Sequence, residues 1–278
     1  MNSLLIENIV RQALLEDLGH GRDVTSELLI PGDAMAKAIL RAREPGVLAG
    51  LIIGLSAFTL TDSDFEITVH ANDGDAVESG QMIAEIEGPA RPLLTAERVA
   101  LNFIQQMSGV ASLTAKYVEE VKGTDAKITC TRKTVPNLRA LQKYAVRCGG
   151  GHNHRSGLDD MILIKDNHIA IAGGIEEALD HALAGGHSLK IEIEVDTIRQ
   201  LEAVLKHGGA DIVMLDNFNV MDLKKAVALA KGKIITEASG GVTLKTVRAI
   251  AETGVDYISV GALTHSAPAL DLALDIDA

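Results

Sequence analysis

The sequence predicts an α/β protein in which an incomplete, open β/α barrel is joined to a smaller N-terminal α+β sandwich domain. Beyond residue 120, strand-like runs rich in β-branched residues alternate with helical segments, which is typical of parallel β/α units. Only six such runs can be counted, whereas a closed barrel has about eight. The first hundred residues lack this alternation. A chain of 278 residues, 47% of them hydrophobic, is long enough to bury a core in each domain.

The N-terminal domain is expected to span residues 1–108. Residues 265–278 do not continue the barrel repeat, so this segment is expected to return to the N-terminal domain. Apolar spacing distinguishes its helices from its strands. In chain order we expect a helix over 4–18, a strand over 34–44, a helix over 46–58, strands over 65–71 and 81–88, and a helix over 95–121.

The turn segment NDGDAVESG, residues 72–80, separates the two short strands of this domain. It resembles the hairpin turn of biotinyl or lipoyl carriers. Such a carrier needs an exposed lysine at the tip of the hairpin, and this segment contains none. The segment is therefore expected to be an ordinary turn.

The barrel domain is expected to span residues 109–264. Polar residues stand near the ends of its later strands at a regular spacing, namely Glu194, Asp216, Glu237 and Ser259. Successive strands of a barrel present side chains at one rim in this way. The expected strands cover 127–131, 161–166, 190–195, 211–217, 233–239 and 256–262, with helices over 174–186, 197–210, 219–230 and 243–254.

Composition narrows the class of function. The formal net charge is −12, and 3% of the residues are aromatic with no tryptophan, which disfavours a nucleic-acid-binding protein. The N-terminus lacks the pattern of a signal peptide, and no stretch approaches the roughly 20 apolar residues that a membrane span needs. Two cysteines, Cys130 and Cys148, form no disulfide framework. A cytoplasmic protein that contacts neither nucleic acid nor membrane is expected.

Positive charge is concentrated in one segment of this acidic chain. Between Arg132 and His168 there are seven Lys or Arg residues against three acids, at positions 132, 133, 139, 143, 147, 155 and 165 against 159, 160 and 166. The rest of the chain then holds 26 − 7 = 19 basic and 38 − 3 = 35 acidic residues. Such a distribution indicates a local pocket for a multiply charged anion.

Four cationic residues are candidates for binding that anion. Arg132 and Lys133 follow a predicted strand directly, where barrel enzymes place reactive groups, and Arg155 and Lys165 recur at the next strand and its lead-in. Arginine binds a carboxylate or phosphate through two hydrogen bonds, and lysine acts as a point charge. The glycines over 149–151 permit positive φ and close approach of the backbone to a ligand. The alternatives are a solvated loop for the cations and a disordered connector for the glycines.

His152 and His154 form an H-x-H pair, which leaves a metal site open as an alternative. Metal-dependent barrel hydrolases use this spacing on their first strand. Here the pair precedes the second barrel strand and stands beside an arginine. The other candidate ligands, His181, His187 and His207, fall inside or at the ends of predicted helices. A metal-dependent hydrolase is therefore the alternative from a different class of function.

The late strands supply a second kind of group. The segments TEASGG (236–241) and SVGAL (259–263) place serines and glycines at the ends of the last two strands, where backbone N–H groups of barrels often bind phosphate. Glu194 and Asp216 could bind ribose hydroxyls or Mg²⁺, which prefers oxygen ligands. A phosphorylated sugar with a leaving group, plus an anionic acceptor, would use the cations, the carboxylates and the phosphate site together.

Ten ordered motifs are spread over nearly the whole length of the chain. They are DLGHGRDVT (17–25), LTAERVALNF (94–103), TRKTVPNLR (131–139), KYAV (143–146), GGGHNHRSGLDD (149–160), LIKDNH (163–168), EIEVD (192–196), MLDN (214–217), EASGG (237–241) and DYISVGALTHS (256–266). Together these motifs resemble the quinolinate phosphoribosyltransferase family. One departure is Asn137, where the family usually has glycine. Asparagine tolerates left-handed backbone, so the turn is expected to persist.

The resemblance implies an enzyme that joins quinolinate to phosphoribosyl pyrophosphate with Mg²⁺ and releases pyrophosphate and CO2 to give nicotinate mononucleotide. It also implies a homodimer with sites near the subunit boundary. By motif, Arg132, His154 and Arg155 would hold the two quinolinate carboxylates, with Arg98 supplied by the partner. Lys133 and Lys165 would meet the pyrophosphate and the substrate carboxylate. Glu194 and Asp216 would bind ribose and Mg²⁺, and Ser239, Gly240 and Gly261 the 5′-phosphate. The nearest rival is a paralogous phosphoribosyltransferase that acts on another pyridine or pyrimidine acid.

Overall fold

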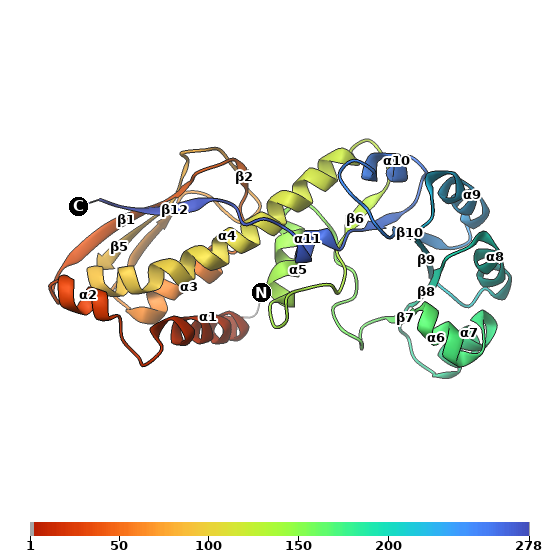
Figure 1. Ribbon diagram of the computed structural model, residues 1–278, viewed down its shortest axis with the longest axis horizontal. Coiled ribbons are helices and arrows are strands. Elements are labelled where there is room, and N and C mark those ends of the chain that lie inside the picture. Colours follow the sequence, from red (N-terminus) through yellow and green to blue (C-terminus); the bar gives the residue numbers. More distant parts are fainter. Residues whose placement is uncertain (1–2, 278) are drawn as a thin grey trace. The chain divides into compact units, whose positions relative to one another are not determined.

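The computed structural model describes residues 3–277, and the chain divides into two compact units (Figure 1). Unit 1 comprises Met1–Leu113, Leu141–Gly150 and Ala267–Ala278, and unit 2 comprises Thr114–Ala140 and Gly151–Ser266. The segment Leu141–Gly150 therefore groups with unit 1, although the predicted boundaries place it in the barrel. One physical reason is a hydrogen bond from the Tyr144 hydroxyl to Oδ2 of Asp73, at 2.8 Å.

Unit 1 is built on a four-stranded antiparallel sheet in the order β12-β1-β5-β3. The C-terminal strand β12 lies at its edge, where Ala38 of β1 faces Ile276. A second, two-stranded sheet pairs β2 with β4. The strands are β1 (Met35–Ala42), β2 (Gly46–Val47), β3 (Glu66–Val69), β4 (Ala76–Val77), β5 (Met82–Pro89) and β12 (Leu272–Asp277).

The helices of unit 1 depart from prediction in three places. The helix expected over 46–58 begins only at Leu51, because Gly46–Val47 form a strand and Gly50 has φ 87°. The turn-rich stretch near residue 25 contains a short helix that Asp23 caps by accepting from the amide of Ser26. The long helix begins five residues earlier than expected. The helices are α1 (Ser3–Leu18), α2 (Val24–Leu29), α3 (Leu51–Thr61) and α4 (Ala90–Glu120), the last of which continues into unit 2.

Unit 2 is built on one six-stranded sheet in the order β6-β11-β10-β9-β8-β7, and every pairing in it is parallel. All six predicted strands are present, and β6 and β7 lie at the two edges of the sheet, so the barrel is open as predicted. The strands are β6 (Lys127–Thr129), β7 (Ile162–Ile164), β8 (Ile191–Val195), β9 (Ile212–Asp216), β10 (Ile235–Ser239) and β11 (Tyr257–Ser259).

Helices cover this sheet on its outer side, where α7, α8 and α9 follow one another in Figure 1. Three helices were not predicted, α5, α6 and α11, and α10 is shorter than the helix expected over 243–254. None of the helices within residues 3–277 is both long and apolar enough to cross a bilayer. The helices are α5 (Arg139–Cys148, shared with unit 1), α6 (Asp166–Ala172), α7 (Ile175–Ala184), α8 (Ile198–His207), α9 (Val220–Ala230), α10 (Val247–Ala251) and α11 (Ala262–His265).

The register of the parallel strands arranges their polar side chains in layers. Asp216 is opposite Ser239, so these two share the outermost layer at the carboxyl ends. Met214 is opposite both Glu194 and Glu237, which therefore lie one layer deeper. Side chains two residues apart point to the same face of a strand, so Glu192 lies on the same face in a third layer. The prediction that Glu194, Asp216, Glu237 and Ser259 lie at one rim is therefore wrong for Glu194 and Glu237, which lie one layer below Asp216 and Ser259.

Candidate active site

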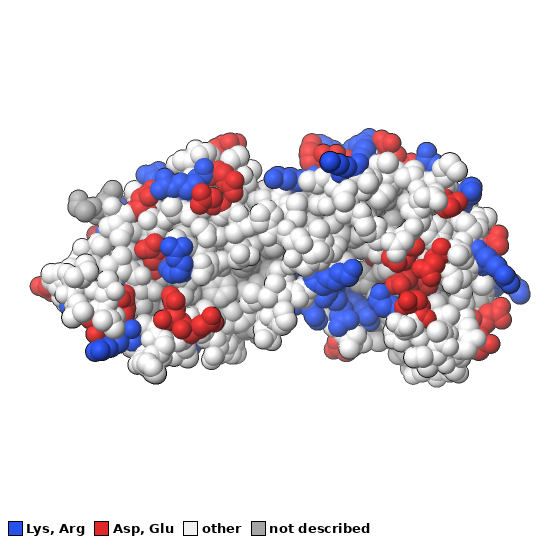
Figure 2. Space-filling view, viewed as in Figure 1, with Lys and Arg blue, Asp and Glu red and all other residues white. Residues whose placement is uncertain are grey.

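A cavity of about 400 Å³ opens at the carboxyl ends of the strands of unit 2. Basic and acidic side chains gather side by side on the face of this unit seen in Figure 2, near the labels β7 and β8 of Figure 1. Eight of the eleven predicted site residues line the cavity. They are Arg132, Lys133, His154, Arg155, Lys165, Glu194, Asp216 and Ser239, and the other lining residues are Thr131, Leu163, Met214, Glu237 and Ser259.

Three predicted residues lie outside this lining. Gly240 directly follows Ser239 of the lining. A Cβ built on Gly261 would come within 3.2 Å of Cδ of Lys133, so Gly261 lies beside that lysine. Arg98 is an exposed residue of α4 in unit 1.

The guanidinium groups of Arg132 and Arg155 carry the anion-binding character of the cavity. The Nε atom of each is buried without a hydrogen-bond partner in the described part of the chain. Burial lowers the pKa of Arg155, and the charge of Arg132 lowers it further. A buried donor without an acceptor costs roughly 1–3 kcal/mol, and two neighbouring cations repel each other. An anion that accepts from both would relieve both costs.

The loop that follows α5 positions Arg155. Nη1 of Arg155 donates to the carbonyl of Met161 at 3.1 Å. The carboxylate of Asp160 accepts from the amides of Ser156 and Gly157, at 2.6 and 3.1 Å. Of the three glycines over 149–151, only Gly150 has positive φ, at 81°. It follows the last turn of α5, so its left-handed backbone ends that helix.

The loop after β6 positions Lys133. Its amide donates to Oγ1 of Thr131 at 3.0 Å, and its carbonyl accepts from Oγ1 of Thr264 at 2.7 Å. The Lys133 side chain itself is exposed. In the same loop Asn137 has φ 66°, so the left-handed conformation expected where the family usually has glycine is confirmed.

Lys165, which directly follows β7, forms an ion pair with Glu194 of β8, with Nζ 2.7 Å from Oε2. The lysine is half exposed and the glutamate nearly buried, at 45% and 10% of their side-chain surfaces. The amide of Lys165 donates to Nδ1 of His168 at 2.9 Å. This hydrogen bond caps the N-terminus of α6. A half-exposed cation thus meets a nearly buried carboxylate in the lining of the cavity.

The segment after β10 passes close to the segment after β9. Oδ2 of Asp216 accepts from the side-chain amide of Asn217 at 2.6 Å. Gly240 has φ 96°, and a Cβ there would collide with the side chain of Asn217. Both the backbone conformation and the lack of space therefore require glycine at position 240.

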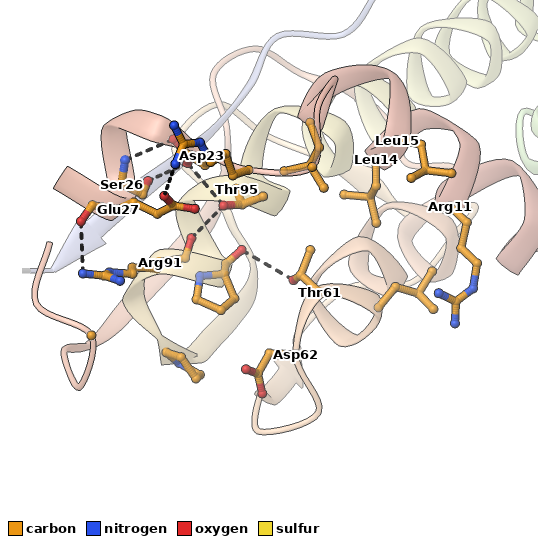
Figure 3. Close-up of a pocket in the computed structure, with 17 residues that line it drawn as sticks. Arg11, Leu14, Leu15, Asp23, Ser26, Glu27, Thr61, Asp62, Arg91 and Thr95 are labelled. Carbon is orange, nitrogen blue, oxygen red and sulfur yellow. Dashed lines mark hydrogen bonds and ion pairs between the residues drawn. The ribbon is translucent and has the colours of Figure 1, made fainter. Parts of the chain in front are cut away.

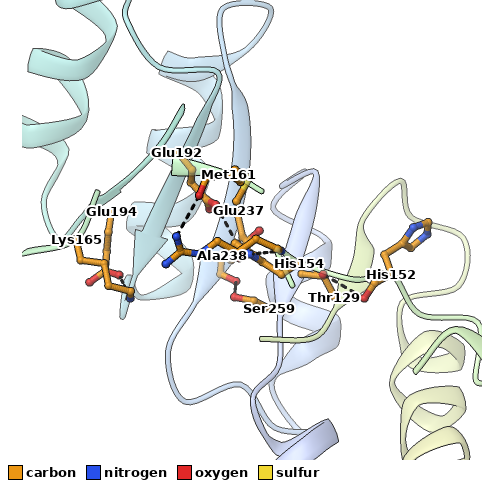
Figure 4. A network of polar contacts seen from close by, with 11 residues as sticks. Thr129, His152, His154, Met161, Lys165, Glu192, Glu194, Glu237, Ala238 and Ser259 are labelled. Carbon is orange, nitrogen blue, oxygen red and sulfur yellow. Dashed lines mark hydrogen bonds and ion pairs between the residues drawn. The ribbon is translucent and has the colours of Figure 1, made fainter. Parts of the chain in front are cut away.

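Beneath the cations lies a buried cluster of His154, Glu192 and Glu237, which sequence reasoning missed as a unit (Figure 4). Nε2 of His154 is 2.9 Å from Oε2 of Glu192 and 3.7 Å from Oε1 of Glu237. The side chains of the three residues are 7%, 0% and 5% exposed, respectively. The alternating E-x-E pattern of β8 was visible in the sequence, but only the register of the sheet brings Glu192 and Glu237 to one histidine.

His154, Glu192 and Glu237 are also the one group among the described residues whose ligand atoms are close enough to hold a metal ion. The tautomer of His154 argues against such a role. Nδ1 accepts from the amide of Arg155 at 2.8 Å, so the proton of a neutral ring is on Nε2, the atom that faces the carboxylates. A protonated nitrogen cannot ligate a metal. The H-x-H pair does not converge either, because His152 is exposed and packs edge-on against Tyr257 with ring centroids 6.5 Å apart.

Burial and the neighbouring charge of Glu192 raise the pKa of Glu237 to about 7. The folded protein therefore binds this proton more tightly than the unfolded chain, whose Glu has an ordinary pKa of 4.5. The resulting stability is complete below pH 4.5 and is lost as the pH rises through about 7.

We expect Glu237→Gln to remove this pH dependence. Between pH 5 and 8 the free energy of unfolding of the unsubstituted protein should fall relative to that of the variant by on the order of 3 kcal/mol. Denaturant unfolding of both proteins at each pH measures the difference. Parallel stability curves for the two proteins would contradict the assignment.

A larger cavity of about 690 Å³ lies in unit 1 (Figure 3), but its polar groups are paired within the protein. Arg11 pairs with Glu7 at 2.9 Å, and Nε of Arg91 donates to the carbonyl of Ile30 at 2.8 Å. Asp23 accepts from Ser26, which lowers its pKa, and also from Thr95. The smaller cavity, with its buried unpartnered guanidinium donors, is therefore the better candidate for an anionic substrate.

Comparison with known families assigns the chain. Residues 23–108 match the N-terminal domain of quinolinate phosphoribosyl transferase, and residues 110–275 match its C-terminal domain. The chain belongs to the quinolinate phosphoribosyltransferase family. The two matched segments together cover most of the sequence, which agrees with a resemblance spread over many ordered motifs.

Members of the quinolinate phosphoribosyltransferase family resemble this chain from end to end. A protein of Bacillus subtilis named probable nicotinate-nucleotide pyrophosphorylase [carboxylating] is 44% identical, with 99% of this chain and 95% of that protein covered. A nicotinate-nucleotide pyrophosphorylase [carboxylating] of Mycobacterium leprae is 43% identical, with 96% of this chain and 95% of that protein covered. The crystal structure of NadC from Streptococcus pyogenes matches with a TM-score of 0.96 at 40% identity, and the match covers 100% of this chain and 98% of that chain. The structure of the nicotinate-nucleotide pyrophosphorylase from Francisella tularensis matches with a TM-score of 0.95 at 41% identity, and the match covers 100% of this chain and 98% of that chain.

Proposed function

We propose that this protein is a carboxylating nicotinate-nucleotide pyrophosphorylase, a pentosyltransferase of NAD biosynthesis. It joins quinolinate to phosphoribosyl pyrophosphate and releases nicotinate mononucleotide, pyrophosphate and CO2. The names of relatives at 42–44% identity over nearly the full length support this function. The observation that carries it in the structure is the pair of buried, unpartnered guanidinium donors of Arg132 and Arg155 in a cavity that carboxylates also line.

The cationic side of the cavity is proposed to bind quinolinate. The two carboxylates of this substrate would accept from Arg132 and Arg155, with His154 beside them and Lys165 at the edge of the cavity. Arginine suits this role because its donors match both oxygens of a carboxylate. Arg98 of a second copy of the chain would complete the site in a homodimer.

The part of the cavity that carries the carboxylates, which adjoins the cationic part at the ion pair of Lys165 and Glu194, is proposed to bind phosphoribosyl pyrophosphate. Glu194 and Asp216 would meet the ribose hydroxyls, Lys133 the pyrophosphate, and the segments around Ser239, Gly240 and Gly261 the 5′-phosphate. The required glycine at position 240 supports close approach of the backbone to a phosphate.

Magnesium fits the same side. Glu194 and Asp216 offer only carboxylate oxygens, the donors that Mg²⁺ prefers, and both line the cavity. The two residues would hold the ion partly through the substrate. When bound, Mg²⁺ would offset the charge of the pyrophosphate.

The proposed residues act by positioning and charge. As the bond from the ribose carbon to pyrophosphate breaks, positive charge develops on the sugar, and the carboxylates of Glu194 and Asp216 stabilise it. The pyridine nitrogen, held in line by the grip on both carboxylates, forms the new bond. The ring nitrogen is then positive and adjacent to C2, so its charge stabilises the electron pair that stays on C2 when CO2 leaves. A proton from water then binds C2 in place of the carboxylate. No covalent enzyme intermediate is required.

The direct test is incubation of the purified protein with quinolinate, phosphoribosyl pyrophosphate and Mg²⁺. Nicotinate mononucleotide and CO2 should appear in equal amounts. Turnover of another pyridine or pyrimidine acid in place of quinolinate would instead identify a paralogous phosphoribosyltransferase. Cys130 and Cys148 form no disulfide within the described residues, which supports the proposal that the enzyme works in the reducing cytoplasm.

Lys133→Ala and Lys165→Ala should each lower kcat/KM by about a hundredfold or more, because the first removes the charge proposed to meet the leaving pyrophosphate and the second the charge proposed to meet the substrate carboxylate. The melting temperature should stay near that of the unsubstituted protein, since neither lysine is buried. Lys206→Ala, an exposed lysine of α8, is the matched control and should keep full activity. A large drop in melting temperature for either site variant would show that the lysine stabilises the fold.

A further inference from the structure

A chain of contacts leads from the buried cluster beneath the cavity to the backbone of Arg155. It begins at Glu192, passes through both ring nitrogens of His154 and ends at the backbone of Arg155. Neither carboxylate oxygen of Glu192 accepts a hydrogen bond within the described part of the chain, although its side chain is fully buried. An uncompensated buried carboxylate is costly, so its close contact with Nε2 of His154 is the interaction that offsets this cost.

The same contact determines which nitrogen of His154 carries the proton. A carboxylate 2.9 Å from Nε2 favours a proton on that atom, and the second carboxylate, at 3.7 Å, acts in the same direction. Nδ1 then keeps its lone pair and accepts from the amide of Arg155, at 2.8 Å. The hydrogen bond of one nitrogen commonly decides the state of the other in this way.

Arg155 is consequently held at both ends. Its amide is bonded to His154, and its Nη1 donates to the carbonyl of Met161 at 3.1 Å. Its Nε lies buried without a partner. A guanidinium restrained in this way loses less conformational freedom when it binds a carboxylate, which improves affinity.

We propose that Glu192, assisted by Glu237, is a positioning residue that holds the proton of His154 on Nε2 and thereby orients Arg155 for the substrate carboxylate. Glu192 itself touches no substrate in this arrangement. The part that concerns the carboxylate rests on the proposed function, whereas the state of His154 does not.

The first measurement is made on the unsubstituted protein. Nitrogen-15 NMR of the imidazole at pH 7.5 should show His154 neutral, with its proton on Nε2. An imidazolium ion, or a proton on Nδ1, would overturn the proposal whatever the variants do.

The second measurement compares Glu192→Leu, which removes the carboxylate, with Glu192→Gln, which keeps the size and one acceptor oxygen. In Glu192→Leu the His154 signals should average between the two tautomers, the Arg155 amide should exchange about tenfold faster, and quinolinate should bind about tenfold more weakly by calorimetry. Glu192→Gln should stay within about threefold of the unsubstituted protein, and Glu237→Leu should lie between the two. Affinity for phosphoribosyl pyrophosphate should not change.

Glu202→Gln, an exposed position of α8, is the control and should alter nothing. If Glu192→Leu keeps one Nε2–H signal and full affinity for quinolinate, the proposal is wrong. It is equally wrong if Glu192→Gln loses as much affinity as the leucine variant, since charge and not position would then matter. Should Glu192→Leu fail to fold, the imidazole spectrum of the unsubstituted protein and the affinity of Glu192→Gln for quinolinate still test the proposal. If the unsubstituted protein binds no quinolinate, the proposed function fails, and the imidazole spectra alone test the positioning role.

Discussion

Heterodimers that combine one Arg98→Ala chain with one Lys133→Ala chain should regain activity that neither homodimer has. Arg98 belongs to α4 in unit 1 and Lys133 to the loop after β6 in unit 2. If Arg98 acts on the partner's cavity, one cavity of the heterodimer combines an intact barrel with an intact Arg98, and the other collects both defects. Two-fold symmetry then predicts about half the activity of the unsubstituted dimer for isolated heterodimers, and about a quarter for a random mixture.

The matched control carries both substitutions on one chain and none on the other. In this heterodimer each cavity contains one defect if Arg98 acts on the partner, so both cavities should be nearly inactive. The two heterodimers contain the same substitutions and differ only in which chain carries them. Chains are mixed by co-expression or refolding, and each heterodimer is confirmed by mass. The reverse pattern, with activity only in the control, would show that Arg98 serves its own chain.

Nicotinate should be a poorer acceptor than quinolinate by about a thousandfold or more in kcat/KM. It has one carboxylate where quinolinate has two, so part of the cationic side would stay buried and unpaired. A site built for a polar group rejects an analogue that lacks it by roughly this factor, because the buried donors lose their partners. The unpartnered Nε atoms of Arg132 and Arg155 are such donors.

Steady-state kinetics with both acids at a fixed concentration of phosphoribosyl pyrophosphate measures this ratio. An isomeric pyridine dicarboxylate whose second carboxylate is not adjacent to the first is the control, since it has the charge of quinolinate without its geometry. It should also be a poor acceptor. Comparable turnover of nicotinate and quinolinate would contradict the assignment of two carboxylate-binding arginines.

Local patterns were sufficient to predict most elements of the fold. The apolar β-branched runs of unit 2 became six parallel strands, since a strand buried on both faces needs that composition whatever its neighbours are. Helices with weaker signals were missed. No helix was predicted for the segment of α5, RALQKYAVRC, whose three basic residues were counted only toward the local concentration of positive charge. Its buried face, which includes Leu141 and Ala145, became evident only once the helix was in place.

By itself, the sequence determined the chemical types at the site and the strand ends that carry them. Arg132, Lys133, Lys165 and Asp216 could be predicted because each stands at or just after a strand, and carboxyl ends of parallel strands meet at one edge. Only the tertiary structure decided how deep each side chain lies. Strand register placed Glu192 and Glu237 below the rim and against His154, and register depends on contacts between strands that are distant in sequence. The electrostatic state of the site, including the proton on His154, therefore follows from packing that no local pattern records.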